Sequence, residues 1–305
     1  MSRYDVVIVG AGPAGIFTAL ELKDKAPQLD VLLVDEGLTI DRRNCPARKT
    51  GRCVHCQPCN IMSGWSGAGA FSDGKLSLSE EVGGNIVDYM SAEEARYADS
   101  QYTRFGAPDK VHGLNDKKVE EIDYECSRHN IHLVKCPVRH MGTEYSFETL
   151  RNMYRYLIEQ PGFTFRELTR AQSLHIENGR VTGVVLCTKG QEPESVEAGY
   201  VVAAPGRGGA DWLNHVAHDN GIDTKNNEVD IGVRVEVPNS VMDHLTAHLY
   251  EAKMVYYSDT FENKVRTFCM NPGGIVSEEH YQGGIAVVNG HSYAEEERRT
   301  ANTNF

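Results

Sequence analysis

The sequence predicts an α/β fold, and three observations at its start support this prediction. Residues 4–9 and 31–34 are short runs of β-branched and other apolar residues, a composition typical of buried parallel strands. Residues 16–25, which lie between them, combine good helix formers with helical spacing of the apolar positions. Glycines join the first strand to this helix, so the chain opens as a strand, a tight turn, a helix and a second strand.

The turn over residues 10–15 has the G-x-G-x-x-G spacing of a dinucleotide-binding segment. The first glycine permits the tight turn, the second lets a pyrophosphate approach the backbone, and the third lets helix and strand pack closely. The helix that follows presents free N–H groups and a partial positive charge to the phosphates. We therefore expect the turn to bind a dinucleotide through Gly10, Gly12, Pro13, Ala14 and Gly15.

An acidic residue at the end of the second strand completes this pattern, because it accepts hydrogen bonds from ribose hydroxyls. Asp35, twenty residues after Gly15, fits that role best. Glu36 is the alternative, since a strand end inferred from sequence is uncertain by about one residue.

Composition excludes several classes of function. The chain has 305 residues and a net charge of −12, and its Lys and Arg residues form no basic stripe, which argues against nucleic-acid binding. No apolar run approaches the ~20 residues of a membrane span, and the N-terminus lacks the features of a signal peptide. The eight cysteines do not have the spacing of a secreted disulfide framework, so we expect a cytoplasmic protein with reduced thiols.

Two further glycine-rich segments are expected near the nucleotide. Residues 61–78 interleave Gly, Ala and Ser with apolar residues, which indicates close backbone approach rather than a solvated linker. Residues 201–206 are an apolar strand that runs into a glycine turn without the dinucleotide spacing. We expect that strand to return to the first sheet, with its turn at the carboxyl edge where ligands bind.

The remaining pattern predicts helices at 91–105, 117–130 and 147–160, the last with Ser146 as its N-cap. Asn178-Gly179 predicts a β-hairpin. A β-rich region, with a strand at 230–237, is expected beyond Val229.

These features together resemble FAD-binding flavoproteins of the glutathione-reductase type, through the glycine turn, Asp35, the hairpin and the Pro205-Gly206-Arg207 turn. More narrowly, Cys-x2-Cys-x2-Cys followed by the Gly67-to-Leu76 block resembles bacterial FAD-dependent, NAD(FAD)-utilising dehydrogenases whose substrate is uncharacterised. Asp211-Trp212-Leu213 and the closing Ala301-Asn-Thr-Asn-Phe305 resemble the same family.

The resemblance implies a Rossmann-like FAD-binding domain with an inserted, β-rich α+β substrate domain. We expect residues 1–77 and 146–228 in the first, and 78–145 and 229–305 in the second. Flavoproteins of this type close the FAD site with a late C-terminal segment that this chain lacks, so we expect the substrate domain to be incomplete and the chain truncated. The two glycine-rich segments add Gly67, Gly69, Gly206 and Arg207 to the expected cofactor contacts, and the alternative for Arg207 is that it only caps its turn.

A cysteine-rich loop has three interpretations. Cys45, Cys53, Cys56 and Cys59 suit a zinc or iron–sulfur site. A redox dithiol, Cys53/Cys56 or Cys56/Cys59, is the second, although the family's disulfide usually has a wider spacing. Unrelated reduced thiols are the third.

The leading hypothesis is an FAD-dependent oxidoreductase that transfers hydride or electrons through flavin, with NAD(P)H as a candidate reductant and a small-molecule substrate or acceptor. Lys75 is a weak catalytic candidate, and a surface lysine is equally consistent with its sequence context. The alternative is a non-enzymatic FAD- or metal-binding sensor or assembly protein that uses the Cys45–Cys59 loop. The sequence does not indicate an oligomeric state.

Overall fold

A computed structural model describes residues 2–82, 88–114, 117–226, 229–280 and 286–305. The chain divides into two compact units, each discontinuous in sequence. The first comprises Met1–Phe71 and Leu150–Asp230, and the second Ser72–Thr149 and Ile231–Phe305. The predicted FAD-binding role of residues 1–77 and 146–228 stays a prediction, as does the predicted substrate role of residues 78–145 and 229–305.

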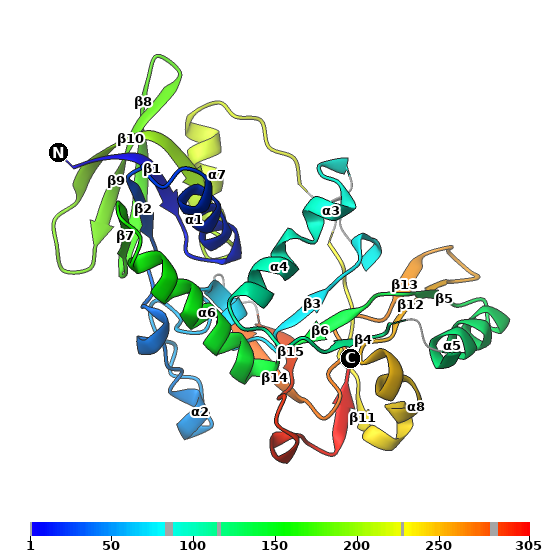
Figure 1. The fold of residues 1–305 in the computed structure, drawn as a ribbon. Coiled ribbons are helices and arrows are strands. Elements are labelled where there is room, and N and C mark those ends of the chain that lie inside the picture. The colour runs from blue at the N-terminus through cyan, green and yellow to red at the C-terminus, as the bar shows by residue number, and fades with distance from the viewer. Residues whose placement is uncertain (1, 83–87, 115–116, 227–228, 281–285) are drawn as a thin grey trace. The chain divides into compact units, whose positions relative to one another are not determined.

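A six-stranded mixed sheet forms the centre of the first unit (Figure 1). Its strands lie in the order β7 (Phe163–Arg166), β2 (Val31–Val34), β1 (Arg3–Val9), β10 (Glu194–Ala203), β9 (Arg180–Thr188) and β8 (Thr169–Glu177). The first four are parallel, and β8 and β9 form an antiparallel hairpin at one side. The first unit is therefore α/β with a Rossmann-like sheet, as its opening residues predict.

The sequence explains the centre of this sheet. All four residues of β2 and the last four of β1 are buried, as expected for parallel strands covered on both faces. Helix α1 (Pro13–Lys25) buries Ile16, Ala19 and Leu20. At the predicted hairpin, Asn178 and Gly179 both have positive φ (51° and 75°), the conformation that a tight two-residue turn requires.

The helix predicted at 147–160 begins earlier than expected. Helix α6 spans Gly142–Ile158 and passes from the second unit into the first. Ser146 is therefore not an N-cap but a buried residue, 2% exposed, inside the helix. The first unit also contains α2 (Ala47–Thr50), α7 (Ala210–Asp219) and short 3-10 helices at Ile40–Arg42 and Gly67–Phe71.

The second unit consists of small antiparallel sheets and helices. One sheet has the order β3 (Lys75–Ser77), β6 (Val138–His140), β4 (Val111–His112), and another β13 (Lys264–Arg266), β12 (Lys253–Tyr257), β5 (His132–Val134). Strand β14 (Ile275–His280) pairs with β15 (Ala286–His291), and β11 (Glu236–Pro238) with β16 (Asn302–Asn304). The helices are α3 (Ala92–Ala95), α4 (Tyr97–Arg104), α5 (Lys117–Arg128), α8 (Asn239–Leu249) and 3-10 turns at Glu80–Val82 and Glu296–Arg298.

The strand predicted at 230–237 is wrong over most of its length. Only Glu236–Pro238 forms a strand, and Val229, Ile231 and Val233 are 81%, 94% and 86% exposed. Alternating apolar residues predict a strand, but a strand forms only where another strand offers hydrogen bonds, and here only β16 does so.

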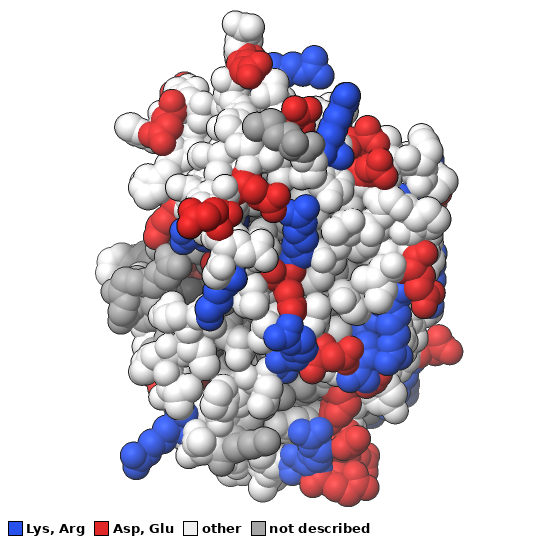
Figure 2. Space-filling view, turned by 90° about the vertical axis from the view of Figure 1, so that its left-hand side faces the viewer, with Lys and Arg blue, Asp and Glu red and all other residues white. Residues whose placement is uncertain are grey.

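Acidic and basic side chains are interspersed on the face of the molecule shown in Figure 2. Within the described parts of the chain, we find no helix with the length and apolar character needed to cross a bilayer.

Candidate functional site

The glycine turn at the end of β1 is packed too tightly for other residues at two of its positions. Gly10 has a φ of +101°, and a Cβ atom there would overlap the Ala204 carbonyl oxygen. A Cβ atom at Gly15 would overlap the Gly10 carbonyl oxygen. Gly10 thus lets β1 turn beside the end of β10, and Gly15 lets α1 pack against that turn.

Gly12 is different, because a side chain at this position would point into open space. A Cβ atom at Gly12 would meet no heavy atom within 4 Å, and the φ of −73° suits any residue. Neither space nor backbone conformation therefore requires glycine here. Gly12 is the N-cap of α1, no side chain caps the helix, and the first turn contains no acidic residue. Pro13 and Ala14 are exposed. The helix therefore presents uncapped N–H groups and positive dipole charge to an open surface, which suits a phosphate.

Asp35 holds three backbone segments together. Its Oδ2 accepts the N–H of Ala11 at 2.8 Å, and its Oδ1 accepts those of Gly37 at 2.8 Å and Gly64 at 2.7 Å. Both carboxylate oxygens are thus engaged by the protein itself. The charge-assisted bonds order the edge of the sheet around the glycine turn.

Glu36 occupies a different environment. Its Oε1 accepts a 2.8 Å hydrogen bond from Ser63 Oγ, and a Cβ atom at Gly208 would lie 3.9 Å from the same oxygen. Glu36 is half-buried, whereas Gly206 and Arg207 in the adjacent turn are exposed. The Glu36 carboxylate therefore lies between the Ser63 segment and the glycine turn that follows β10.

The glycine-rich segment after Asn60 reaches the start of α1. The N–H of Ser66 donates to the Ala11 carbonyl oxygen at 2.7 Å. A Cβ atom at Gly67 would lie 3.5 Å from Gly12 Cα, and one at Gly69 would lie 4.0 Å from Pro13 Cγ. The sequence predicts three separate segments near the nucleotide, and the structure brings them together. They are the first glycine turn, residues 64–69 and the turn after β10.

Comparison with known families gives this arrangement a context. Residues 4–206 match the pyridine nucleotide-disulphide oxidoreductase family, and residues 228–305 match the FAD-dependent protein, C-terminal domain-like family. The first match covers more than half of the chain. The chain belongs to the pyridine nucleotide-disulphide oxidoreductase family. The expected likeness to FAD-dependent flavoproteins is confirmed at this level, and the narrower dehydrogenase subfamily stays a prediction.

A curated relative from Clostridium beijerinckii, described as an uncharacterized protein, is 26% identical over 308 residues, which cover 97% of this chain and 50% of the relative. The chain therefore spans about half the length of that relative.

Solved structures that match part of this chain include the following three. E. coli quinol fumarate reductase is 15% identical with a TM-score of 0.43, covering 68% of this chain and 34% of that one. The 3-ketosteroid-delta4-(5alpha)-dehydrogenase from Rhodococcus jostii is 19% identical with a TM-score of 0.42, and the match covers 66% of this chain and 45% of that one. L-amino acid deaminase from Proteus vulgaris is 15% identical with a TM-score of 0.39, and the match covers 73% of this chain and 51% of that one.

The four cysteines of the cysteine-rich loop differ in exposure. Cys53 is exposed and Cys45, Cys56 and Cys59 are half-buried, all as free thiols. Over the described ranges, no three His, Cys, Asp or Glu side chains converge as metal ligands. The zinc, iron–sulfur and dithiol interpretations stay predictions.

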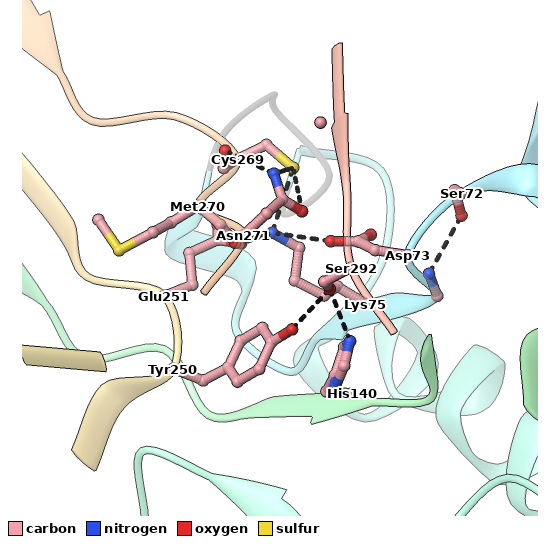
Figure 3. A network of polar contacts seen from close by, with 12 residues as sticks. Ser72, Asp73, Lys75, His140, Tyr250, Glu251, Cys269, Met270, Asn271 and Ser292 are labelled. Atoms are coloured by element: carbon pink, nitrogen blue, oxygen red, sulfur yellow. Dashed lines mark hydrogen bonds and ion pairs between the residues drawn. The ribbon is translucent and has the colours of Figure 1, made fainter. Parts of the chain in front are cut away.

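Lys75 lies in a buried ionic cluster of the second unit, not on the surface (Figure 3). Its Nζ is 3.2 Å from Asp73 Oδ2, pairs with Glu251 and donates to the Met270 carbonyl oxygen at 2.7 Å. Cys269 Sγ lies 3.1 Å from the same nitrogen. Burial opposes the charged form, but the surrounding Asp73, Cys269 and Glu251 outweigh it and raise the pKa of Lys75.

The cluster includes charges that sequence reasoning missed. Glu251 also pairs with Lys253, and burial, which favours its neutral form, is outweighed by the two ammonium groups, which lower its pKa. Burial raises the pKa of Asp73. Beside the cluster, Ser292 Oγ lies 3.0 Å from His140 Nε2 and 2.8 Å from the Tyr250 hydroxyl. The local sequence contains one indication of these buried charges: in residues 250–254, charged residues alternate with apolar ones.

Proposed function

We propose that this chain binds FAD in its first unit and belongs to an oxidoreductase that moves hydride or electrons through the flavin. The observation that carries the proposal is Gly12: an uncapped helix N-terminus bordered by Gly67, in a turn whose first glycine, Gly10, packs against Ala204 at the end of β10. These residues fit the group, because a cradle of glycines and free N–H groups accepts a diphosphate. Bound flavin supplies reversible hydride and single-electron transfer.

Within this proposal, α1 and residues 10–15 bind the diphosphate, and Gly206 and Arg207 border the nucleotide. Glu36 binds the ribose hydroxyls, since the Asp35 oxygens already accept three backbone N–H groups. The second unit contributes to the substrate side. NADH or NADPH serves as the reductant, in keeping with the resemblance to NAD(FAD)-utilising dehydrogenases.

Two glycines offer a matched test of cofactor binding. Neither Gly12 nor Gly232 has a positive φ, and a Cβ atom at either meets nothing within 4 Å, so both tolerate a side chain. Gly12→Glu places a carboxylate where the diphosphate binds, and we expect at least about 100-fold weaker FAD binding from charge repulsion and lost space. Gly232→Glu should bind FAD like the unchanged chain. Equal affinities of the two variants would contradict the proposed site.

The redox proposal is tested separately with the flavin-loaded chain. Anaerobic addition of NADH or NADPH should bleach the flavin absorbance, and an added electron acceptor should restore it. If FAD binds and neither nucleotide reduces it, the nicotinamide part of the proposal fails while the cofactor site stands.

A further inference from the structure

Arg43 is a buried cation that binds residues 60–67, the segment that contacts the glycine turn at residues 10–15. Its side chain is 5% exposed and makes five hydrogen bonds to backbone carbonyl groups. Nε and Nη2 share the Asn60 carbonyl oxygen at 3.1 and 3.0 Å, and Nη2 also binds that of Ile61 at 2.7 Å. Nη1 binds the carbonyl oxygens of Trp65 and, at 2.7 Å, Gly67.

No carboxylate in the described part of the chain forms an ion pair with this guanidinium. Burial lowers the pKa of Arg43 to about 10, against the opposing influence of Asp35 and Cys59. The side chain therefore stays charged at neutral pH. A buried charge is costly unless polar groups compensate it, and here four carbonyl dipoles do so. All four belong to one short segment.

The position of these carbonyls gives Arg43 a specific effect. Nη1 binds the carbonyl groups on both sides of Ser66, a non-glycine residue with a φ of +74°. That conformation is strained for serine and needs support from its surroundings. Ser66 is also the residue whose N–H binds the Ala11 carbonyl oxygen. Arg43 thus supports the strained residue that joins residues 60–67 to the glycine turn.

We propose that Arg43 is a positioning residue of the cofactor site: it fixes residues 60–67 so that Gly67 borders the N-terminus of α1. The inference rests on the proposed FAD site. Arg43 acts through the backbone and needs no contact with the cofactor. Its five fixed donors match four carbonyls, which the three donors of a lysine cannot match.

Lys23 provides a matched control. It is also buried, 2% exposed, and its Nζ donates to the carbonyl oxygens of Pro27 and Leu29 at 2.8 and 2.9 Å, near the opposite end of α1. Arg43→Met and Lys23→Met both remove a buried cation from backbone carbonyls of the first unit. Only Arg43→Met should alter the segment at the cofactor site.

The experiment uses the full chain and two measurements: the FAD dissociation constant from flavin fluorescence, and hydrogen exchange of residues 60–67 without FAD. We expect Arg43→Met to weaken FAD binding at least about 10-fold and to speed exchange in this segment, and Lys23→Met to do neither. Arg43→Lys should give intermediate values, and it carries the test if Arg43→Met does not fold.

Unchanged affinity and exchange in both Arg43 variants would overturn the inference and leave the proposed function intact. Equal losses in Arg43 and Lys23 variants would also overturn it, because general destabilisation would then explain both. If the unchanged chain binds no FAD, the proposed function fails, and the inference fails with it.

Discussion

The backbone N–H of Ala11 donates a 2.8 Å hydrogen bond to the carboxylate of Asp35, twenty-four residues away. Asp35 therefore stabilises the fold of the site, and in the proposed function it is Glu36 that binds the ribose. We expect Asp35→Ala to lower the free energy of unfolding of the first unit by about 3 kcal/mol, since three N–H groups lose their acceptor. Glu36→Gln should change it by less than about 1 kcal/mol and weaken FAD binding.

Urea unfolding followed by tryptophan fluorescence measures this difference, because both tryptophans, Trp65 and Trp212, belong to the first unit. If Asp35→Ala leaves stability unchanged but abolishes FAD binding, Asp35 is the ribose ligand after all.

Trp65 and Trp212 form a second pair for comparison. Each donates its indole N–H to a backbone carbonyl, Trp65 to Leu150 at 3.0 Å and Trp212 to Gln172 at 3.1 Å. Trp65 is fully buried and packs edge-on against Tyr154, with ring centroids 5.0 Å apart, whereas Trp212 is half-buried. We expect Trp65→Phe to cost about 2–3 kcal/mol and Trp212→Phe less than about 1 kcal/mol.

Urea unfolding followed by circular dichroism suits this pair, because each variant loses a fluorophore. Equal costs would mean that the Trp65 pocket relaxes around phenylalanine.

Removal of Lys75 should destabilise the second unit strongly. Lys75→Met leaves the carboxylates of Asp73 and Glu251 buried with less compensation, which we expect to cost about 3–5 kcal/mol. Lys118→Met removes an exposed pair with Glu121 at 2.6 Å and should cost less than about 0.5 kcal/mol. Thermal unfolding of both variants tests the contrast, and a mild effect of Lys75→Met would show that water reaches the cluster.

His140 should make the second unit sensitive to acid. Burial, with a contribution from Lys75, lowers the pKa of His140 to about 3. An unfolded histidine titrates near 6.5, so the unfolded state binds more protons between these values and stability falls as the pH falls. The expected loss is roughly 1.4 kcal/mol per pH unit below about 6.5.

Urea unfolding at pH values on either side of that point measures the slope. His140→Gln should flatten it, whereas His218→Gln should not, because His218 is 89% exposed. An unchanged slope in His140→Gln would assign the acid sensitivity to another group.

The first unit was predictable from sequence because its signals are local. The glycine turn, the helix after it and the Asn178-Gly179 hairpin each depend on residues adjacent in the chain. The role of Asp35 was not predictable in this way. Its partners Ala11 and Gly64 lie far from it in sequence, and a strand-end acid has the same pattern whether it binds ribose or backbone.

The second unit was harder because its structure depends on distant partners. Lys75 begins an alternation of polar and apolar residues that is typical of a surface strand. Its burial depends on Glu251 and Cys269, which lie 176 and 194 positions later in the chain. Residues 229–235, most of which are exposed, have strand-like alternation without a strand beside most of them. The alternation of apolar residues shows that a segment can form a strand, but the strand forms only if a neighbouring strand pairs with it.

The pairing of β1 with β10 has a consequence for synthesis on the ribosome. Arg3 lies opposite Glu197, so one edge of β1 stays unpaired during synthesis until β10, much later in the chain, has been made. Gly10 likewise meets Ala204 only at that stage. Until β10 has been made, that edge of β1 is open, and open strand edges are places where other chains pair. The glycine turn at residues 10–15 can therefore reach its packed form only after Ala204 has been made.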